Sequence, residues 1–369
     1  MGAGTRRVWA LIAAAAVVLG GAGIAGCGSS DSGGGDSEKG GTIALLLPET
    51  KTTRYEEQDR PNFERRVKEL CKNCKVIYSN ANQDPAKQQQ QAEAAITKGA
   101  KVIVISAVDV ASAGAIVKRA KQQNVKVIAY GRLIPDADID YYVSIDPYKV
   151  GQQQARSQMK ALTAQGKKNP RIVMINGAPT DSNAKPYKDG AASIFKQQGA
   201  KIVKSYDTAD WSPDKAQQEM EQSITSLGKN GFEGVYVAND GMASGAIAAL
   251  DGAGIDPSTR LVTGQDAELA GVQRILAGKQ LMTVYQPIIK IARTSAELAV
   301  PIAQGKKPPA NLTPDKVNNG AKEVPSALLD TTEITKDNID DTVVKDGFLK
   351  AQDICTAAYA SACKAAGIV

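Results

Sequence analysis

The strongest constraint in this sequence is a regular alternation of short apolar runs and amphipathic stretches that starts at Gly41. The apolar runs are typical of strands buried on both faces, and the stretches between them have helical periodicity. Predicted strands cover residues 42–47, 76–78, 102–105 and 125–130, and predicted helices cover 63–70, 85–96 and 111–120. Strands joined through helices run parallel, so we predict a parallel sheet with helices on both faces.

The same alternation of apolar runs and amphipathic stretches repeats in the second half of the chain. Predicted strands cover residues 171–175, 202–206, 235–238 and 261–263, and helices start near Asn183, Pro213, Met242 and Ala267. About 330 residues follow the N-terminal segment, which is too many for one core. We therefore predict an α/β fold of two doubly wound parallel-sheet lobes joined by a hinge. Lobe one is expected to hold residues 42–145 and about 287–317, and lobe two residues 146–286 and about 318–369.

The N-terminal segment predicts export. Arg6 and Arg7 precede an apolar run over residues 8–19, which suits a signal-peptide core and is short for a membrane span. Ile24-Ala25-Gly26-Cys27 then resembles the lipobox of bacterial lipoproteins and makes Cys27 the candidate lipidation site. We expect residues 1–26 to be a signal peptide and residues 27–41 a flexible Gly- and Ser-rich tether. An ordinary signal peptide with a chance cysteine is the alternative.

The composition excludes several classes of site. The chain has no histidine, which removes the commonest general base and metal ligand and with them Ser-His-Asp, Cys-His and HExxH chemistry. Carboxylate-only catalysis stays possible, but we expect no enzyme, no cofactor and no metal. The formal charge of +6 is interspersed along the chain, so nothing indicates a nucleic-acid partner.

Four further cysteines form two local pairs, Cys71 with Cys74 and Cys355 with Cys363. An even number of cysteines in an exported chain favours structural disulfides. A redox motif would open a helix after a strand, whereas Cys71 and Cys74 end a helical pattern and precede a strand. A redox site, or a zinc site shared by both pairs, is the weaker alternative.

Polar and aromatic residues gather where the predicted strands end. They are Arg54-Tyr55, Tyr130-Gly131-Arg132, Asp181-Ser182-Asn183, Asp210-Trp211, Asn239-Asp240 and Gln265-Asp266. Ligands of α/β proteins bind at the carboxyl ends of parallel strands, so we expect these side chains to converge on one cleft. Carboxylates accept from hydroxyls, arginine and asparagine donate to oxygens, and an aromatic face covers the C–H face of a pyranose.

This set of residues predicts a polyol site. The alternative for each residue is a local structural role as a turn residue or helix cap, which applies to Asp181, Asn183 and Asp266 in particular. Trp211 could likewise be a packing residue. Convergence of five strand ends is what favours a ligand site over these separate local roles.

Several segments between residues 42 and 350 carry a resemblance to a known family. They are residues 129–134, 136–144, 181–185, 239–240, 264–271, 282–285 and 318–320. In order and spacing they resemble the type I periplasmic binding proteins, and within them the D-xylose-binding group. The resemblance implies a Venus-flytrap fold with a sugar between the lobes. It places sugar contacts on Arg54, Arg132, Asp181, Asn183, Trp211, Asn239 and Asp266, with Tyr55 as a neighbouring aromatic.

Two positions depart from the pattern of that group. Gly131 stands where the group has an aspartate before its second arginine, and Gln286 stands where it has a lysine. One carboxylate acceptor and one ammonium donor are thus missing together, and Gly131 opens space. A buried polar partner left unsatisfied costs about 1–3 kcal/mol. The resemblance therefore implies D-xylose first, with glucose or another aldose carrying an extra CH2OH as the competitor.

The resemblance also implies the partners. It indicates a monomeric binding lipoprotein, held on the outer face of the cell membrane, that delivers a monosaccharide to the permease and ATPase of an ABC importer. Two alternatives stay open. One is a receptor module that presents the sugar-loaded form to a sensor kinase. The other is a glycosidase that uses Asp181 and Asp266.

Overall fold

The computed structural model of the chain describes residues 40–368. The predicted signal peptide, Cys27 and all of the predicted tether before Gly40 lie outside the described residues. Across the described part of the chain, no helix combines the length and the apolar character needed to cross a membrane.

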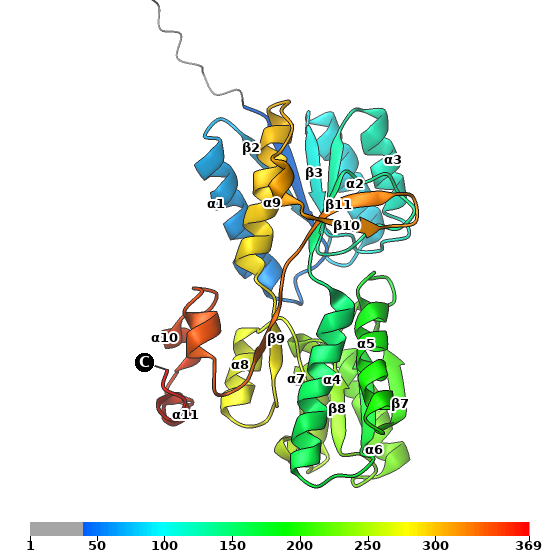
Figure 1. The fold of residues 1–369 in the computed structure, drawn as a ribbon, viewed down its shortest axis with the longest axis vertical. Coiled ribbons are helices and arrows are strands. Elements are labelled where there is room, and N and C mark those ends of the chain that lie inside the picture. Colours follow the sequence, from blue (N-terminus) through cyan, green and yellow to red (C-terminus); the bar gives the residue numbers. More distant parts are fainter. Residues whose placement is uncertain (1–39, 369) are drawn as a thin grey trace, which may run out of the picture. The chain divides into compact units, whose positions relative to one another are not determined.

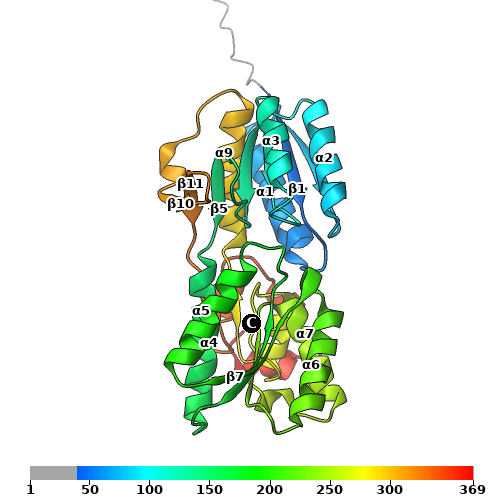
Figure 2. The same cartoon turned by 90° about the vertical axis from the view of Figure 1, so that its right-hand side faces the viewer.

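Seven strands form the first sheet, in the order β10-β11-β5-β4-β3-β1-β2. They are β1 (Thr42–Leu47), β2 (Lys75–Asn80), β3 (Val102–Ile105), β4 (Lys126–Tyr130), β5 (Tyr141–Ser144), β10 (Asp315–Asn318) and β11 (Glu323–Leu328). Neighbouring strands run parallel, except that β10 and β11 form an antiparallel hairpin. Figures 1 and 2 show two layers of helices around this sheet: α1 (Arg60–Leu70) and α9 (Ile288–Ala303), and on the other face α2 (Pro85–Thr97) and α3 (Gly114–Gln122).

Strand β1 shows why the first sheet is buried on both faces. Ile43, Leu45 and Leu47 belong to the core beneath α1 and α9, whereas Ala44 and Leu46 belong to the core beneath α2 and α3. Because successive side chains of a strand point to opposite faces, only a continuous apolar run can fill both cores.

The middle of the chain builds the second sheet, in which β7 (Lys201–Asp207), β6 (Arg171–Asn176) and β8 (Gly234–Val237) run parallel in that order. Helices α4 (Pro147–Ala164) and α5 (Ala184–Gln197) pack together on one side, and α6 (Pro213–Leu227) and α7 (Asp240–Gly252) pack on the other (Figure 2). A separate antiparallel pair joins β9 (Thr283–Tyr285) to β12 (Thr332–Ile334). The remaining helices are α8 (Leu269–Leu276), α10 (Ala351–Ile354) and α11 (Ala360–Ala365).

Prolines and short polar side chains set the starts of several helices. Asp84 accepts from the backbone N–H of Lys87 at the start of α2, and Asp146 accepts from that of Lys149 at the start of α4. In both cases proline occupies the next position, where its missing N–H costs nothing.

Two expectations from the sequence were wrong. Residues 323–328 do not belong to lobe two, because β11 pairs with β5 in the first sheet and the chain leaves that sheet only after Leu328. Residues 261–263 do not form a regular strand, although the N–H of Thr263 donates to the carbonyl of Val235. The Thr263 hydroxyl, rather than a backbone carbonyl, receives the N–H of Val237 at 2.9 Å, which interrupts the ladder.

Both cysteine pairs are disulfide-bonded, Cys71 to Cys74 after α1 and Cys355 to Cys363 between α10 and α11. Within residues 40–368, no cluster of three or more carboxylate or thiol side chains is placed to hold a metal ion.

Candidate ligand-binding cleft

The residues singled out at the predicted strand ends line one cavity, at the carboxyl ends of strands from both sheets, with the exception of Tyr130, Ser182, Asp210 and Asp240. Its lining contains Arg54, Tyr55, Gly131, Arg132, Asp181, Asn183, Trp211, Asn239, Asp266 and Gln286. Gln265, from the same strand-end list, lines it too, and two residues that the sequence analysis did not single out also do: Thr52 and Tyr187. Tyr187 lies one helical turn beyond Asn183 on α5, so spacing along that helix could have found it. Thr52 carried no signal of its own.

Arg54 connects the two sides of the cavity. A single π-helical turn, η1 (Tyr55–Asp59), follows it and brings Asp59 within reach. The Nη1 of Arg54 donates to both carboxylate oxygens of Asp59, at 2.9 and 3.1 Å, and its Nε lies 3.3 Å from Oδ1 of Asp266. The guanidinium also stacks 4.5 Å from the ring centroid of Tyr55. Asp59 also accepts a hydrogen bond from the hydroxyl of Tyr130. All five side chains are buried, so Arg54 is held in one orientation.

Arg132 makes the second connection. Its Nε lies 2.7 Å from Oδ2 of Asp181, and its Nη1 donates to the carbonyl of Ala107 at 2.7 Å. Asn183 occupies the N-cap position of α5, but its side chain makes no capping bond. Instead its Nδ2 donates to the carbonyl of Gly131 at 2.8 Å, while its backbone N–H donates to Asp181. The local role expected for a cap residue is thus replaced by a contact between the two sides.

Asn239 does act as a cap. Its Oδ1 accepts from the backbone N–H of Met242 at 3.0 Å at the start of α7. The side chain also hydrogen-bonds Asp266, and Gln286 donates to Oδ1 of Asp266 at 3.0 Å. Burial raises the pKa of Asp266, while Arg54 and the side-chain amides of Gln265 and Asn239 act in the opposite direction. Asn239 therefore caps α7 and also lines the cavity.

The charges that line the cavity balance. Arg54 and Arg132 are matched by Asp266 and Asp181, each pair in contact at 3.3 Å or less. A buried charge without a partner is costly, so a ligand with its own net charge would leave one group uncompensated. The lining suits a neutral molecule with many hydroxyls.

Trp211 supplies the apolar wall. It is buried and meets Tyr187 edge to face, with ring centroids 6.5 Å apart. Its Nε1 has no hydrogen-bond partner within residues 40–368. Gly177, just after β6, lets the indole approach: a Cβ there would lie 2.1 to 2.7 Å from three ring atoms.

Four non-glycine residues near the cavity have positive φ angles: Asp210 (61°), Trp211 (52°), Asp266 (87°) and Ala267 (50°). Such conformations cost about 1–3 kcal/mol each and persist where surrounding contacts impose them. The N–H of Asp266 donates to Val284, and that of Ala267 to Thr283, which ties this loop to β9. The strain lies in the two loops that present Trp211 and Asp266 to the cavity.

The cavity is small, about 30 Å³, which is room for one or two water molecules. Side chains from the two sides therefore fill it by contacting each other. A molecule larger than this can enter only if side chains of the two sides move apart. The contacts of Arg54 with Asp266 and of Arg132 with Asp181 are among those that join the two sides.

Asp240 is a buried carboxylate directly behind the cavity. Its oxygens accept from Gln280 at 2.6 Å, from the hydroxyl of Thr283 at 2.8 Å and from the N–H of Glu268 at 2.9 Å. Burial raises its pKa to about 7, against the opposing effect of Arg274 and of the hydrogen bonds from Gln280 and Thr283. The carboxyl therefore titrates near neutral pH in the folded protein.

The stability of the protein should fall as the pH rises from about 4 to about 7. The unfolded chain releases the Asp240 proton near pH 3.8, whereas the folded chain keeps it until about 7. Between these values the unfolded state binds fewer protons and is favoured by rising pH, by up to about 1.4 kcal/mol per pH unit. Urea unfolding at pH 5, 6 and 7 should show a shallower slope in Asp240→Asn. Asp251→Asn, at an exposed position, is the control and should keep the wild-type slope.

Comparison with known proteins agrees with this geometry. The family model described as "Periplasmic binding protein domain" matches residues 43–307. The chain belongs to this family. It is 38% identical over 316 residues to the D-xylose-binding periplasmic protein of Escherichia coli (strain K12), covering 85% of this chain and 92% of that protein. It is 31% identical over 330 residues to the multiple sugar-binding periplasmic receptor ChvE of Rhizobium radiobacter, covering 85% and 92%.

A solved relative supports the fold of the two sheets. An ABC transporter solute-binding protein from Clostridium phytofermentans with bound β-D-glucose superposes with a TM-score of 0.76 at 28% identity. The match covers 85% of this chain and 99% of that chain. The expected type I periplasmic binding protein fold is thereby confirmed.

Proposed function

We propose that the protein binds a neutral monosaccharide in this cleft and delivers it to an ABC importer. The observation that carries the proposal is the pair of charge-balanced contacts, Arg54 with Asp266 and Arg132 with Asp181, which meet beside an indole face. Each guanidinium can donate to, and each carboxylate accept from, the alternating hydroxyls of a pyranose. The relatives that bind D-xylose and glucose support this ligand class.

Gly131 and Gln286 bear on which sugar is bound. Gly131 has a φ of 72°, and a Cβ there would meet only the hydroxyl of Ser106, at 3.9 Å. The space beside it is therefore open on the side where a side chain would stand. Gln286 donates to Asp266 and leaves no ammonium group in the cavity lining. We propose D-xylose or an aldohexose such as glucose, with the extra CH2OH of the hexose near Gly131.

The proposed mechanism is a hinge. The chain passes between the two sheets at residues 145–146, 286–287 and 329–331. We propose that the two sheets with their helices act as lobes that rotate about these links, open to admit the sugar and close around it. The closed form would then be recognised by the permease. No covalent step is required, and the lining contains no cysteine, lysine or histidine to act as a nucleophile or base.

We further propose that Cys27 carries a lipid that holds the protein on the outer face of the membrane, as the lipobox sequence suggests. A single acyl chain attaches a protein to a membrane reversibly, whereas several acyl chains attach it stably. Mass spectrometry of the N-terminal peptide from the membrane fraction tests this, and an unmodified cysteine would contradict it.

Sugar should stabilise the protein. At a free concentration of roughly 100 times the dissociation constant, the gain is about 2.7 kcal/mol, which raises Tm by several degrees. Thermal-shift and calorimetric measurements over pentoses, hexoses and small disaccharides test it, and the absence of a shift with every sugar would remove the proposal. Analysis of products after long incubation with glycosides tests the absence of turnover.

Gly177→Ala should weaken sugar binding about ten-fold. The new methyl group would collide with Trp211, and overpacking of this kind costs about 1–3 kcal/mol. Titration by tryptophan fluorescence measures the effect, since Trp211 is the only tryptophan within residues 40–368. Gly114→Ala is the matched control, because no atom lies within 4 Å of its added Cβ. Equal affinity in both variants would show that Trp211 does not contact the sugar.

A further inference from the structure

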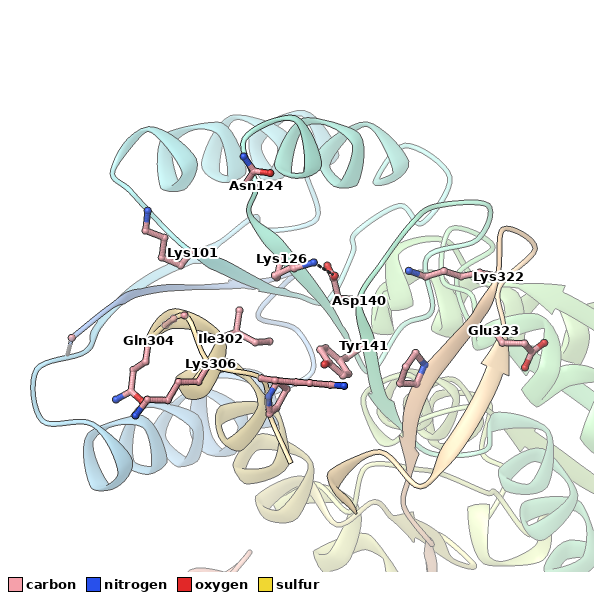
Figure 3. A pocket seen from close by; sticks show the side chains of 16 residues that line it. Lys101, Asn124, Lys126, Asp140, Tyr141, Ile302, Gln304, Lys306, Lys322 and Glu323 are labelled. Atoms are coloured by element: carbon pink, nitrogen blue, oxygen red, sulfur yellow. Dashed lines mark hydrogen bonds and ion pairs between the residues drawn. The ribbon is translucent and has the colours of Figure 1, made fainter. Parts of the chain in front are cut away.

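A second cavity lies at the opposite edge of the first sheet from the cleft. It is a groove of about 820 Å³, lined by residues that immediately precede or begin strands, such as Lys101, Lys126 and Tyr141. In Figure 3 the side chains of Lys101, Lys306 and Lys322 come from three different elements around it. Gly40, the first described residue, also lines the groove.

The backbone at Gly40 and Gly41 is closely confined. A Cβ on Gly40 would lie 2.3 Å from the carbonyl oxygen of Asn73, and one on Gly41 would lie 2.3 Å from that of Ala303. The N–H of Lys75 also donates to the carbonyl of Gly41 at 2.8 Å. The chain therefore enters the fold through a gap that only glycine fits, between the loop after α1 and the end of α9.

Exposed lysines flank this entry point on both sides. Lys72 lies on the loop after α1 and Lys75 is the first residue of β2, whereas Lys306 and Lys307 follow α9. None of these four ammonium groups has an ion pair within the part of the chain that the structure describes. By contrast, Lys126 pairs with Asp140 at 2.8 Å (Figure 3). We refer to Lys72, Lys75, Lys306 and Lys307 as the entry lysines.

We propose that the entry lysines dock the protein on the anionic headgroups of the membrane to which it is tethered. The inference rests on the proposed lipid at Cys27. From Cys27 to Gly40 the chain advances thirteen residues, which reach at most about 45 Å when fully extended. The entry lysines thus flank the point at which the anchored segment joins the fold. Each lysine close to an anionic surface strengthens binding about five-fold, and the effect decays over roughly 8 Å in physiological salt.

Lysines at helix ends also have a local function, because cations stabilise the C-terminal end of a helix. Lys167 and Lys168, on the loop after α4, are in the same local setting: they are exposed and form no ion pair within residues 40–368. Their loop, however, precedes β6 of the second sheet. These two lysines are the matched control for Lys306 and Lys307. They share composition and exposure but not proximity to Gly40.

Lysine acetylation of the lipidated full chain in vesicles tests the proposal. In vesicles of phosphatidylcholine with phosphatidylglycerol at low salt, acetylation of the entry lysines should slow about five-fold or more relative to pure phosphatidylcholine. High salt should restore the rate of acetylation to that in pure phosphatidylcholine. Acetylation of Lys167 and Lys168 should not change. The variant Lys306→Glu with Lys307→Glu should remove the protection of Lys72 and Lys75, whereas Lys167→Glu with Lys168→Glu should retain it.

If the entry lysines and the Lys167–Lys168 pair were acetylated at equal rates in anionic vesicles, the proposal would be overturned. Protection produced by inorganic phosphate with neutral vesicles would also overturn it, because the ligand would then be a free anion. Failure to float with neutral vesicles would instead contradict the lipid at Cys27, and docking would then be judged by flotation with anionic vesicles. Sugar titration of the same samples through Trp211 fluorescence tests the proposed function separately.

Discussion

Replacing Arg54 by methionine should lower the free energy of unfolding by about 3–5 kcal/mol. Methionine keeps most of the side-chain volume but leaves Asp59 and Asp266 buried without a cation, and removing one partner of a buried ion pair carries that cost. The arginine also contributes its stacking on Tyr55. Urea or guanidinium unfolding at pH 7 measures the difference.

The same variant should lose less stability at pH 5 than at pH 8. Without Arg54 the pKa values of Asp59 and Asp266 rise further above that of an unfolded aspartate, so rising pH favours the unfolded state more strongly than in the wild type. Arg156→Met, at an exposed position on α4, is the control and should change stability little. A loss below 1 kcal/mol at pH 8 would mean that the two carboxyls find other partners.

Replacing Arg132 by methionine should weaken sugar binding about 30-fold or more. Arg132 contacts Asp181 across the cavity and is oriented by the carbonyl of Ala107. Truncating one member of a buried charged pair at a binding site costs about 2–5 kcal/mol, because the sugar loses a donor and Asp181 loses its cation. Isothermal titration calorimetry with the sugar that gives the largest thermal shift measures the loss.

Two variants define the cause of that loss. Arg132→Lys keeps the charge but lacks the planar fork that serves two acceptors at once, so its affinity should fall between those of the wild type and Arg132→Met. Arg119→Met, at an exposed position on α3, should bind like the wild type. Unchanged affinity in a folded Arg132→Met would exclude Arg132 from the sugar site.

Much of the fold was predictable because its information is local. The apolar runs that became β1, β3 and β6 are buried on both faces, and only parallel strands covered by helices place every residue of such a run in a core. The residues that line the cavity were predictable for a related reason. Parallel strands bring their carboxyl ends to the same edge, so polar residues after separate strands converge on one cavity.

Predictions failed where a contact joins residues far apart in the chain. Strand β11 contains Pro325, and only its pairing with β5 shows to which sheet it and its hairpin partner β10 belong. Residues 261–263 have the composition of a strand, but the Thr263 side chain takes the hydrogen bond that a ladder would use.

The parallel strands of both sheets, the ends of those strands and the residue types gathered there follow from the amino-acid sequence alone, because strand and helix periodicities are set by neighbouring residues. Three features follow only from contacts between distant segments: Asn183 binds Gly131 instead of capping its helix, Gly177 makes room for Trp211, and Arg54 bridges Asp59 and Asp266. Those outcomes depend on distances between segments that the chain brings together from separate elements, and no local pattern encodes such distances.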